Sequence, residues 1–306
     1  MKLPSQIAVP ESRNDITQEV KRLLRAADVN GRIPTPRADI LACAELVESG
    51  ELNLFAYEES FRTKALGFLH KAVGKVFGYL DFRAKEIYVD PKIHPNKRNF
   101  VTYHEVAHKI LDWQRVIYTQ EDHSTLSPEC KSIFESEANY GAAEILFQCE
   151  KFEEMALDYN IGVASVLELA NLFDASAHST IRRFVERHRQ PCLVLVLKPT
   201  RLEHDEGVQS YVICYSIASV SFLTKFGDPF RNRFINPGDQ LCDIVNKTRQ
   251  SDSIWFKDIN SSSHEFTVEP FDSGYRQFAL ISPTAKKRSR IVARLHIDSG
   301  TMKTAR

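Results

Sequence analysis

The spacing of apolar residues divides this chain into a helical part and a strand-rich part. In the longer first part, apolar residues recur three to four positions apart, as in segment 15–27, which is the pattern of an amphipathic helix. After Pro191 the pattern changes to short runs rich in β-branched and aromatic residues, such as 192–197 and 211–215. We therefore predict an α+β protein with a mostly helical first part and a β-rich second part.

A short stretch with strand-like alternation interrupts the helical part. Residues 85–90 alternate between polar and apolar side chains, shortly before a helical pattern that starts at residue 99. A hairpin at this point would support the helix that follows it. The predicted elements are helices over 15–27, 37–48 and 61–75, a hairpin of 76–82 with 87–90, and a series of helices from 99 to about 188.

The segment His-Glu-Val-Ala-His at 104–108 carries the clearest chemical signal. On a helix, His104 and His108 lie one turn apart on the same face, so both imidazoles can bind one metal ion. Glu105 then lies beside a metal-bound water, where it can act as general base. This geometry is typical of a zinc peptidase. The competing interpretation is a pair of core histidines satisfied by hydrogen bonds.

A third ligand distinguishes the classes of zinc peptidase. In the HExxHxxGxxH class it is a histidine six residues after His108, but Gln114 stands at that position. That class is excluded, and we expect a carboxylate from a second helix. Segment 133–147 has the apolar spacing of such a helix.

Three glutamates lie in this second helix. Glu135 shares a face with Asn139 one turn later, and the amide of Asn139 could accept the free ring N–H of a ligand histidine. Glu137 points elsewhere, so we favour Glu135 over Glu137 as the ligand. Glu144 is interpreted as an ordinary surface or helix-pairing charge.

The segments 99–111 and 135–146 together resemble the ImmA/IrrE metallopeptidases. In that family an HExxH helix is followed by a helix of the form ExEANxFAAxLL, whose first Glu binds the metal and corresponds to Glu135. Gly141 departs from the pattern, which usually has Phe there. The resemblance covers roughly residues 15–188 and implies a zincin-like domain with one Zn²⁺ per chain, although manganese or another divalent ion could occupy the site.

The family resemblance also implies a substrate and a role. Relatives cleave a protein, typically a helix-turn-helix transcriptional repressor, and so release a stress, DNA-damage or mobile-element (phage-defence) response. We expect the repressor to be encoded nearby. From the pattern and the resemblance we predict a loose N-terminal arm (1–14), a zinc metallopeptidase domain (15–150), a helix-turn-helix-like helical segment (151–190) and a β-rich domain, compatible with a GAF-like sensory type (191–306).

A DNA-binding transcriptional regulator with a structural zinc site is the alternative function. The predicted helix pair over 163–186 could place Arg182, Arg183 and Arg187 against DNA. Helix pairs joined by a short turn are also ordinary packing, which we favour because the signature is short. A glutamate between the two histidines favours the enzyme, since a structural zinc site does not use one.

Two further features are candidates for regulation. Cys130 lies in the predicted loop before Glu135, so its thiolate could block the open metal position, although most free cysteines are simply buried. A basic run could bind single-stranded nucleic acid as an activator, although most such runs are solvated loops. This candidate patch consists of Lys286, Lys287, Arg288 and Arg290.

Composition adds only broad limits. The 306 residues are 43% hydrophobic, and 40 basic residues balance 40 acidic ones, so net charge neither requires nor excludes nucleic acid as a partner. The six cysteines form no CxxC pair. No apolar run reaches the roughly twenty residues that span a bilayer, and the N-terminus lacks a secretion signal. We expect a cytoplasmic protein with no membrane contact.

Overall fold

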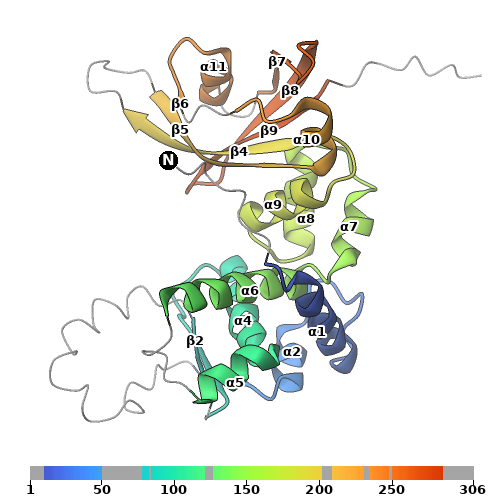
Figure 1. The fold of residues 1–306 in the computed structure, drawn as a ribbon, viewed down its shortest axis with the longest axis vertical. Helices are drawn as coiled ribbons and strands as arrows, with labels where there is room; N and C mark the ends of the chain where they lie inside the picture. The colour runs from blue at the N-terminus through green and yellow to red at the C-terminus, as the bar shows by residue number, and fades with distance from the viewer. Residues whose placement is uncertain are drawn as a thin grey trace, which may run out of the picture.

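The chain folds into a helical part, a connecting group of helices and a β-sheet part, stacked along the long axis of the molecule (Figure 1). The computed structural model describes residues 10–49, 78–82, 84–120, 127–201, 209–230, 234–247 and 250–284. The α+β prediction is confirmed. The predicted helix over 61–75 and the basic run at 286–290 lie outside the described residues.

The first part combines helices with a small sheet. Its helices are α1 (Arg13–Ala26), α2 (Arg37–Cys43), α4 (Pro95–Ile110), α5 (Asp112–Gln120) and α6 (Pro128–Leu146). Its strands are β1 (Val47–Ser49), β2 (Gly78–Asp81) and β3 (Glu86–Val89), in the order β1-β3-β2. β2 and β3 are antiparallel, as the predicted hairpin requires, whereas β1 is parallel to β3.

The predicted helix over 37–48 was wrong in its second half. α2 ends at Cys43, and Glu45 has a φ of 55°, which a helix cannot continue through. Val47 and Glu48 then pair with β3. Because these hydrogen bonds come from a strand far along the chain, local helical spacing does not reveal them. The first helix also differs slightly from its prediction, because α1 begins at Arg13, two residues before the predicted start.

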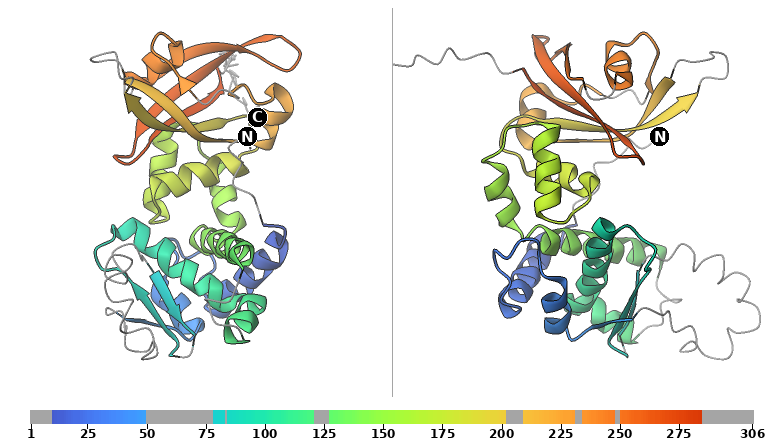
Figure 2. Two further views of the ribbon diagram at one scale, coloured as in Figure 1. Left: turned by 60° about the vertical axis from the view of Figure 1, so that its left-hand side comes forward. Right: turned by 180° about the vertical axis from the view of Figure 1, so that it is seen from behind.

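Three helices connect the two larger parts. They are α7 (Glu150–Ala156), α8 (Val163–Leu172) and α9 (Ala177–Arg187). Figures 1 and 2 show them between the first part and the sheet. Ser176 caps α9 by accepting from the backbone N–H of Ser179. The turn between α8 and α9 also contacts the first part, because the Asn99 side chain donates to Asp174 Oδ2 at 2.7 Å.

The last part is one curved six-stranded sheet with helices on both faces. Its strands are β4 (Leu193–Arg201), β5 (Gln209–Ala218), β6 (Phe234–Ile235), β7 (Asp252–Lys257), β8 (Ser263–Asp272) and β9 (Gln277–Pro283). All pairings are antiparallel, in the order β6-β5-β4-β9-β8-β7. Helices α10 (Val220–Phe226) and α11 (Gln240–Asn246) cover one face.

Alternation along β4 divides the core of the molecule into two clusters. Val194 and Val196 belong to the cluster that continues through α8 and α9 into the first part. Leu193 and Leu195 point to the opposite face and pack in the cluster of α10 and α11. The sheet is therefore joined to the first part through a continuous apolar core. No helix among the described residues is long and apolar enough to span a bilayer.

Candidate metal centre

Helix α4 carries the His-Glu-Val-Ala-His motif and packs closely against α6. Tyr103, Val106 and Ala107 are fully buried on the core side of α4. The two helices approach at Gly141, where a Cβ atom would lie only 2.9 Å from the Cβ of Ala107. Because Gly141 has no side chain, α6 comes close enough to present Glu135 to α4.

The structure brings the three predicted ligands together. His104 Nε2 lies 3.2 Å from His108 Nε2 and 3.2 Å from Glu135 Oε2, and His108 Nε2 lies 3.7 Å from Glu135 Oε1. Ligands about 2.0 to 2.1 Å from a tetrahedral zinc ion are separated by about 3.3 Å from one another. The spacing of these atoms therefore fits one divalent ion held by His104, His108 and Glu135.

Each histidine has an amide partner. His104 forms a side-chain hydrogen bond with Asn139, the residue predicted for this role. Burial lowers the pKa of His104, but Glu135 and the charge of Glu105 raise it by more, so the net shift is upward. His108 Nδ1 instead lies 2.7 Å from Oε1 of Gln114. The two rings are thus held from different helices.

Glu105 is a buried carboxylate next to this cluster. Burial raises its pKa to about 7, and the negative charge of Glu135 adds to the shift while His104 opposes it. Strand β2 lies directly against it, since a Cβ on Gly78 would stand 2.6 Å from Glu105 Oε1. A carboxyl group with a pKa near neutrality can both accept and release a proton, which suits general acid–base catalysis.

Sequence reasoning missed the buried polar residues behind His108. From the sequence, Gln114 is notable only for standing where a third histidine would be, and Glu137 is expected to point away from the metal. Both are buried, and Gln114 Nε2 donates to Glu137 Oε2 at 2.7 Å. The sequence feature that could have indicated this contact is a polar residue, Gln114, at a core-facing position of its helix.

Cys130 is not part of the cluster in the described residues. It lies in the first turn of α6 rather than in the predicted loop, and its backbone N–H donates to Ser127 Oγ. Cys130 lies five positions before Glu135 on α6, which places the two side chains on different faces of the helix. Tyr103 also faces away from the cluster, because its hydroxyl donates to the backbone oxygen of Thr35 at 2.8 Å.

The arginines of α9 are engaged in ion pairs. Arg183 is buried and donates to both carboxylate oxygens of Glu144, and Arg187 contacts Glu144 and Glu153. Arg182 pairs with Glu186 within the helix. Glu144 is therefore a helix-pairing charge as expected, but it is buried rather than exposed. These contacts favour packing over DNA binding for this helix pair.

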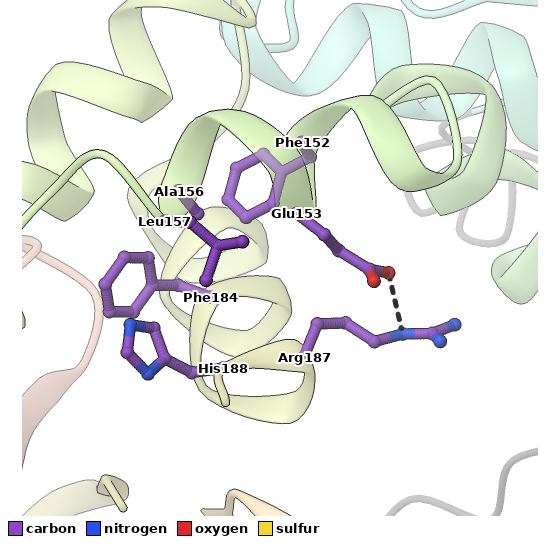
Figure 3. Close-up of a pocket in the computed structure, with 7 residues that line it drawn as sticks. All are labelled: Phe152, Glu153, Ala156, Leu157, Phe184, Arg187 and His188. Atoms are coloured by element: carbon purple, nitrogen blue, oxygen red, sulfur yellow. Dashed lines mark ion pairs between the residues drawn. The ribbon is translucent and has the colours of Figure 1, made fainter. Parts of the chain in front are cut away.

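A small hollow between α7 and α9 is separate from the metal cluster (Figure 3). In Figure 3 the side chains of Leu157, Phe184 and His188 lie close together, and Glu153 pairs with Arg187 at one side. None of the three clustered ligands lines it. Because it also lacks Glu105, this hollow is not where the chemistry of the cluster takes place.

Comparison with known proteins supports a peptidase domain in this chain. Residues 57–185 match the peptidase M78 family model, described as an IrrE N-terminal-like domain. The radiation response metalloprotease IrrE of Deinococcus deserti is 24% identical over 135 residues, covering 44% of this chain. The match covers 48% of that relative, so the chain spans about half of its length. A solved transcriptional regulator of Mycobacterium tuberculosis is similar over 89% of each chain, with a TM-score of 0.48 and 14% identity. Residues 57–185 thus resemble an IrrE N-terminal-like domain, which supports the resemblance of this part of the chain to the ImmA/IrrE metallopeptidases.

Proposed function

We propose that this protein is a zinc-dependent endopeptidase that cleaves a helix-turn-helix transcriptional repressor. The observation that carries the proposal is the grouping of His104, His108 and Glu135 around one point, with Glu105 beside it. A structural metal site has no need for the buried carboxylate of Glu105. The repressor and the stress, DNA-damage or phage-defence role are proposed from the resemblance to the ImmA/IrrE metallopeptidases, and the similar protein of Deinococcus deserti is a radiation response metalloprotease.

The proposed chemistry assigns a separate task to each group. A divalent ion held by His104, His108 and Glu135 would polarise the scissile carbonyl and acidify the attacking water. Glu105 accepts the proton of that water and passes it to the leaving amine nitrogen. Its burial suits this exchange, because a pKa of about 7 makes both protonation states accessible.

The DNA-binding alternative has less support. Its recognition helix would be α9, but Arg183 and Arg187 of α9 contact Glu144 and Glu153 rather than facing solvent as an unpaired group. The helix also contacts strands β4 and β5 on its other side. A helix held between two parts of the same molecule is poorly placed to enter a DNA groove.

The test is cleavage of a helix-turn-helix repressor encoded beside this protein. The purified chain is loaded with zinc and incubated with that repressor, and cleavage is followed by gel electrophoresis and mass spectrometry. The wild type should cut at one site, Glu105→Gln should bind zinc without cutting, and the exposed Glu86→Gln should behave as wild type. Cleavage by Glu105→Gln at the wild-type rate would refute the assigned role of Glu105.

A further inference from the structure

The hydrogen bond between His108 and Gln114 links the metal cluster to a buried polar chain. His108 Nδ1 and Gln114 Oε1 are 2.7 Å apart, and Gln114 has no solvent exposure. This contact alone does not say which group donates, because an amide can present either its oxygen or its NH₂. The direction has to come from the other partners of Gln114.

Those partners orient the amide of Gln114. Its nitrogen lies 2.7 Å from Glu137 Oε2 and 3.2 Å from the backbone oxygen of Phe134. Glu137 Oε2 also accepts from Trp113 Nε1 at 2.8 Å, and Trp113 can only donate. An oxygen that receives two N–H groups is an acceptor, so the NH₂ of Gln114 must face Glu137. Gln114 Oε1 must then face His108.

This orientation decides the tautomer of His108. Because Gln114 Oε1 is an acceptor, His108 Nδ1 must carry the hydrogen. The lone pair is then on Nε2, the atom that lies 3.2 Å from His104 Nε2 and points to Glu135. The polar chain therefore selects the form of the ring that can bind a metal.

Glu137 also connects these hydrogen-bonded side chains to the rest of the domain. It is buried on α6, two residues after Glu135, and its second oxygen accepts from the hydroxyl of Ser12. Trp113 and Gln114 come from α5, so the same carboxylate joins α5, α6 and the residue that precedes α1. The carboxylate of Glu137 thus holds both α6, which carries Glu135, and Gln114, which contacts His108.

We propose that Gln114 and Glu137 are positioning residues that hold His108 in its Nδ1-protonated form and thereby set the metal affinity of the centre. The inference rests on the proposed function only in taking His108 as a metal ligand. Partners of this kind orient ligand histidines in metalloproteins, and their loss weakens metal binding by about 10 to 100-fold. A purely structural role for Gln114 would instead lower stability and leave the affinity unchanged.

The first experiment compares two buried glutamines in the full-length chain. Zinc affinity is measured by competition with a chromophoric chelator for wild type, Gln114→Leu and Gln148→Leu. Gln148 is a matched control, since it is buried and hydrogen-bonded to Val29 and Arg32 at the far end of α6. Gln114→Leu should bind zinc about 10 to 100-fold more weakly, and Gln148→Leu as wild type. Equal affinities for wild type and Gln114→Leu, or equal losses in the two variants, would overturn the proposal.

The second experiment observes the ring of His108 directly. Long-range ¹⁵N–¹H spectra of histidine-labelled protein without added metal report which ring nitrogen carries the hydrogen. The wild type should show the Nδ1-protonated form, and Gln114→Leu a mixture of both tautomers. A wild-type ring protonated at Nε2, or an unchanged ring in Gln114→Leu, would contradict the assignment.

Variants of Glu137 separate orientation from bulk. In Glu137→Ala the side-chain amide of Gln114 can flip and exchange its oxygen and NH₂ positions. The mixture of His108 tautomers should therefore appear again, and zinc affinity should fall. Glu137→Gln keeps an oxygen for Gln114 and Trp113, so it should largely restore both readouts. Wild-type spectra and affinity in Glu137→Ala would refute the part assigned to Glu137. If that variant does not fold, Gln114→Leu decides. Neither readout uses proteolysis, so these results stand or fall separately from the proposed peptidase activity.

Discussion

Gly78 and Glu105 are in such close contact that a side chain at the start of β2 would force its neighbours to move. A Cβ on residue 78 would lie 2.6 Å from Glu105 Oε1 and 2.6 Å from Val101 Cγ1. Real side chains do not tolerate such distances, so either the strand or the carboxylate would have to move. The position of the proposed general base therefore depends on a residue that has no side chain of its own.

We predict that Gly78→Ala impairs catalysis while leaving metal binding intact. The added methyl group would displace the carboxylate of Glu105, and a misplaced general base costs about 100-fold or more in rate. Steady-state cleavage rates and zinc affinity are measured on the same preparations. Gly162→Ala is the control, because Gly162 has an extended backbone and its added Cβ would meet only the Glu269 side chain at 3.3 Å. A wild-type cleavage rate in Gly78→Ala would contradict the close-contact argument.

Cleavage should depend on pH through Glu105. The general base acts in its ionised form, and burial raises the pKa of Glu105 to about 7. The rate should therefore decrease as the pH falls through and below that value. A bound divalent cation favours the ionised carboxylate and moves this limb to lower pH, which makes about 7 an upper limit. The profile of kcat/KM against pH checks this, and an acid limb well above pH 7 would contradict it.

Close packing at Gly141 should make this position intolerant of larger residues. A Cβ there would lie 2.9 Å from the Cβ of Ala107, so α6 would be pushed away from α4. We expect Gly141→Ala to lower the free energy of unfolding by about 1 to 3 kcal/mol, as overpacked cores do. Chemical denaturation measures the change. The double variant Gly141→Ala with Ala107→Gly should recover part of the overpacking loss, and strict additivity of the two changes would argue against a direct clash.

The grouping of His104, His108 and Glu135 could be predicted from the sequence because these residues follow helical spacing. His104 and His108 are one turn apart, and Glu135 could be selected by its position on a single helix face. The hydrogen bonds of Gln114 and Glu137 could not be foreseen, since they depend on how α5 packs against α6. The same limit applies to β1, because its strand partner β3 is distant in the sequence and outweighs a local helical pattern.

The Arg183–Glu144 pair should contribute strongly to stability. Both side chains are buried, at 5% and 2% exposure, and they join α9 to α6. Removing Arg183 leaves the buried Glu144 with only the more exposed Arg187 as its charge partner, and breaking a buried pair in this way costs up to about 3 to 5 kcal/mol. We expect Arg183→Met to lose that amount in urea denaturation. Glu154→Gln breaks the exposed pair with Lys151 and should cost less than about 1 kcal/mol. Equal losses of unfolding free energy in the two variants would show that burial of the Arg183–Glu144 pair does not add to its contribution.

The same buried pair predicts a dependence of stability on acid. Burial raises the pKa of Glu144, but the charge and hydrogen bonds of Arg183 lower it by more, so the carboxyl titrates below its ordinary value in the folded state. Its contribution is therefore complete above the pKa of the unfolded chain and is lost as the pH falls through the lower, folded value. Unfolding free energies across this acid range should decrease more steeply for the wild type than for Glu144→Gln, which has no proton to gain. Parallel curves for the two proteins would mean that the folded and unfolded states hold the proton of Glu144 equally well.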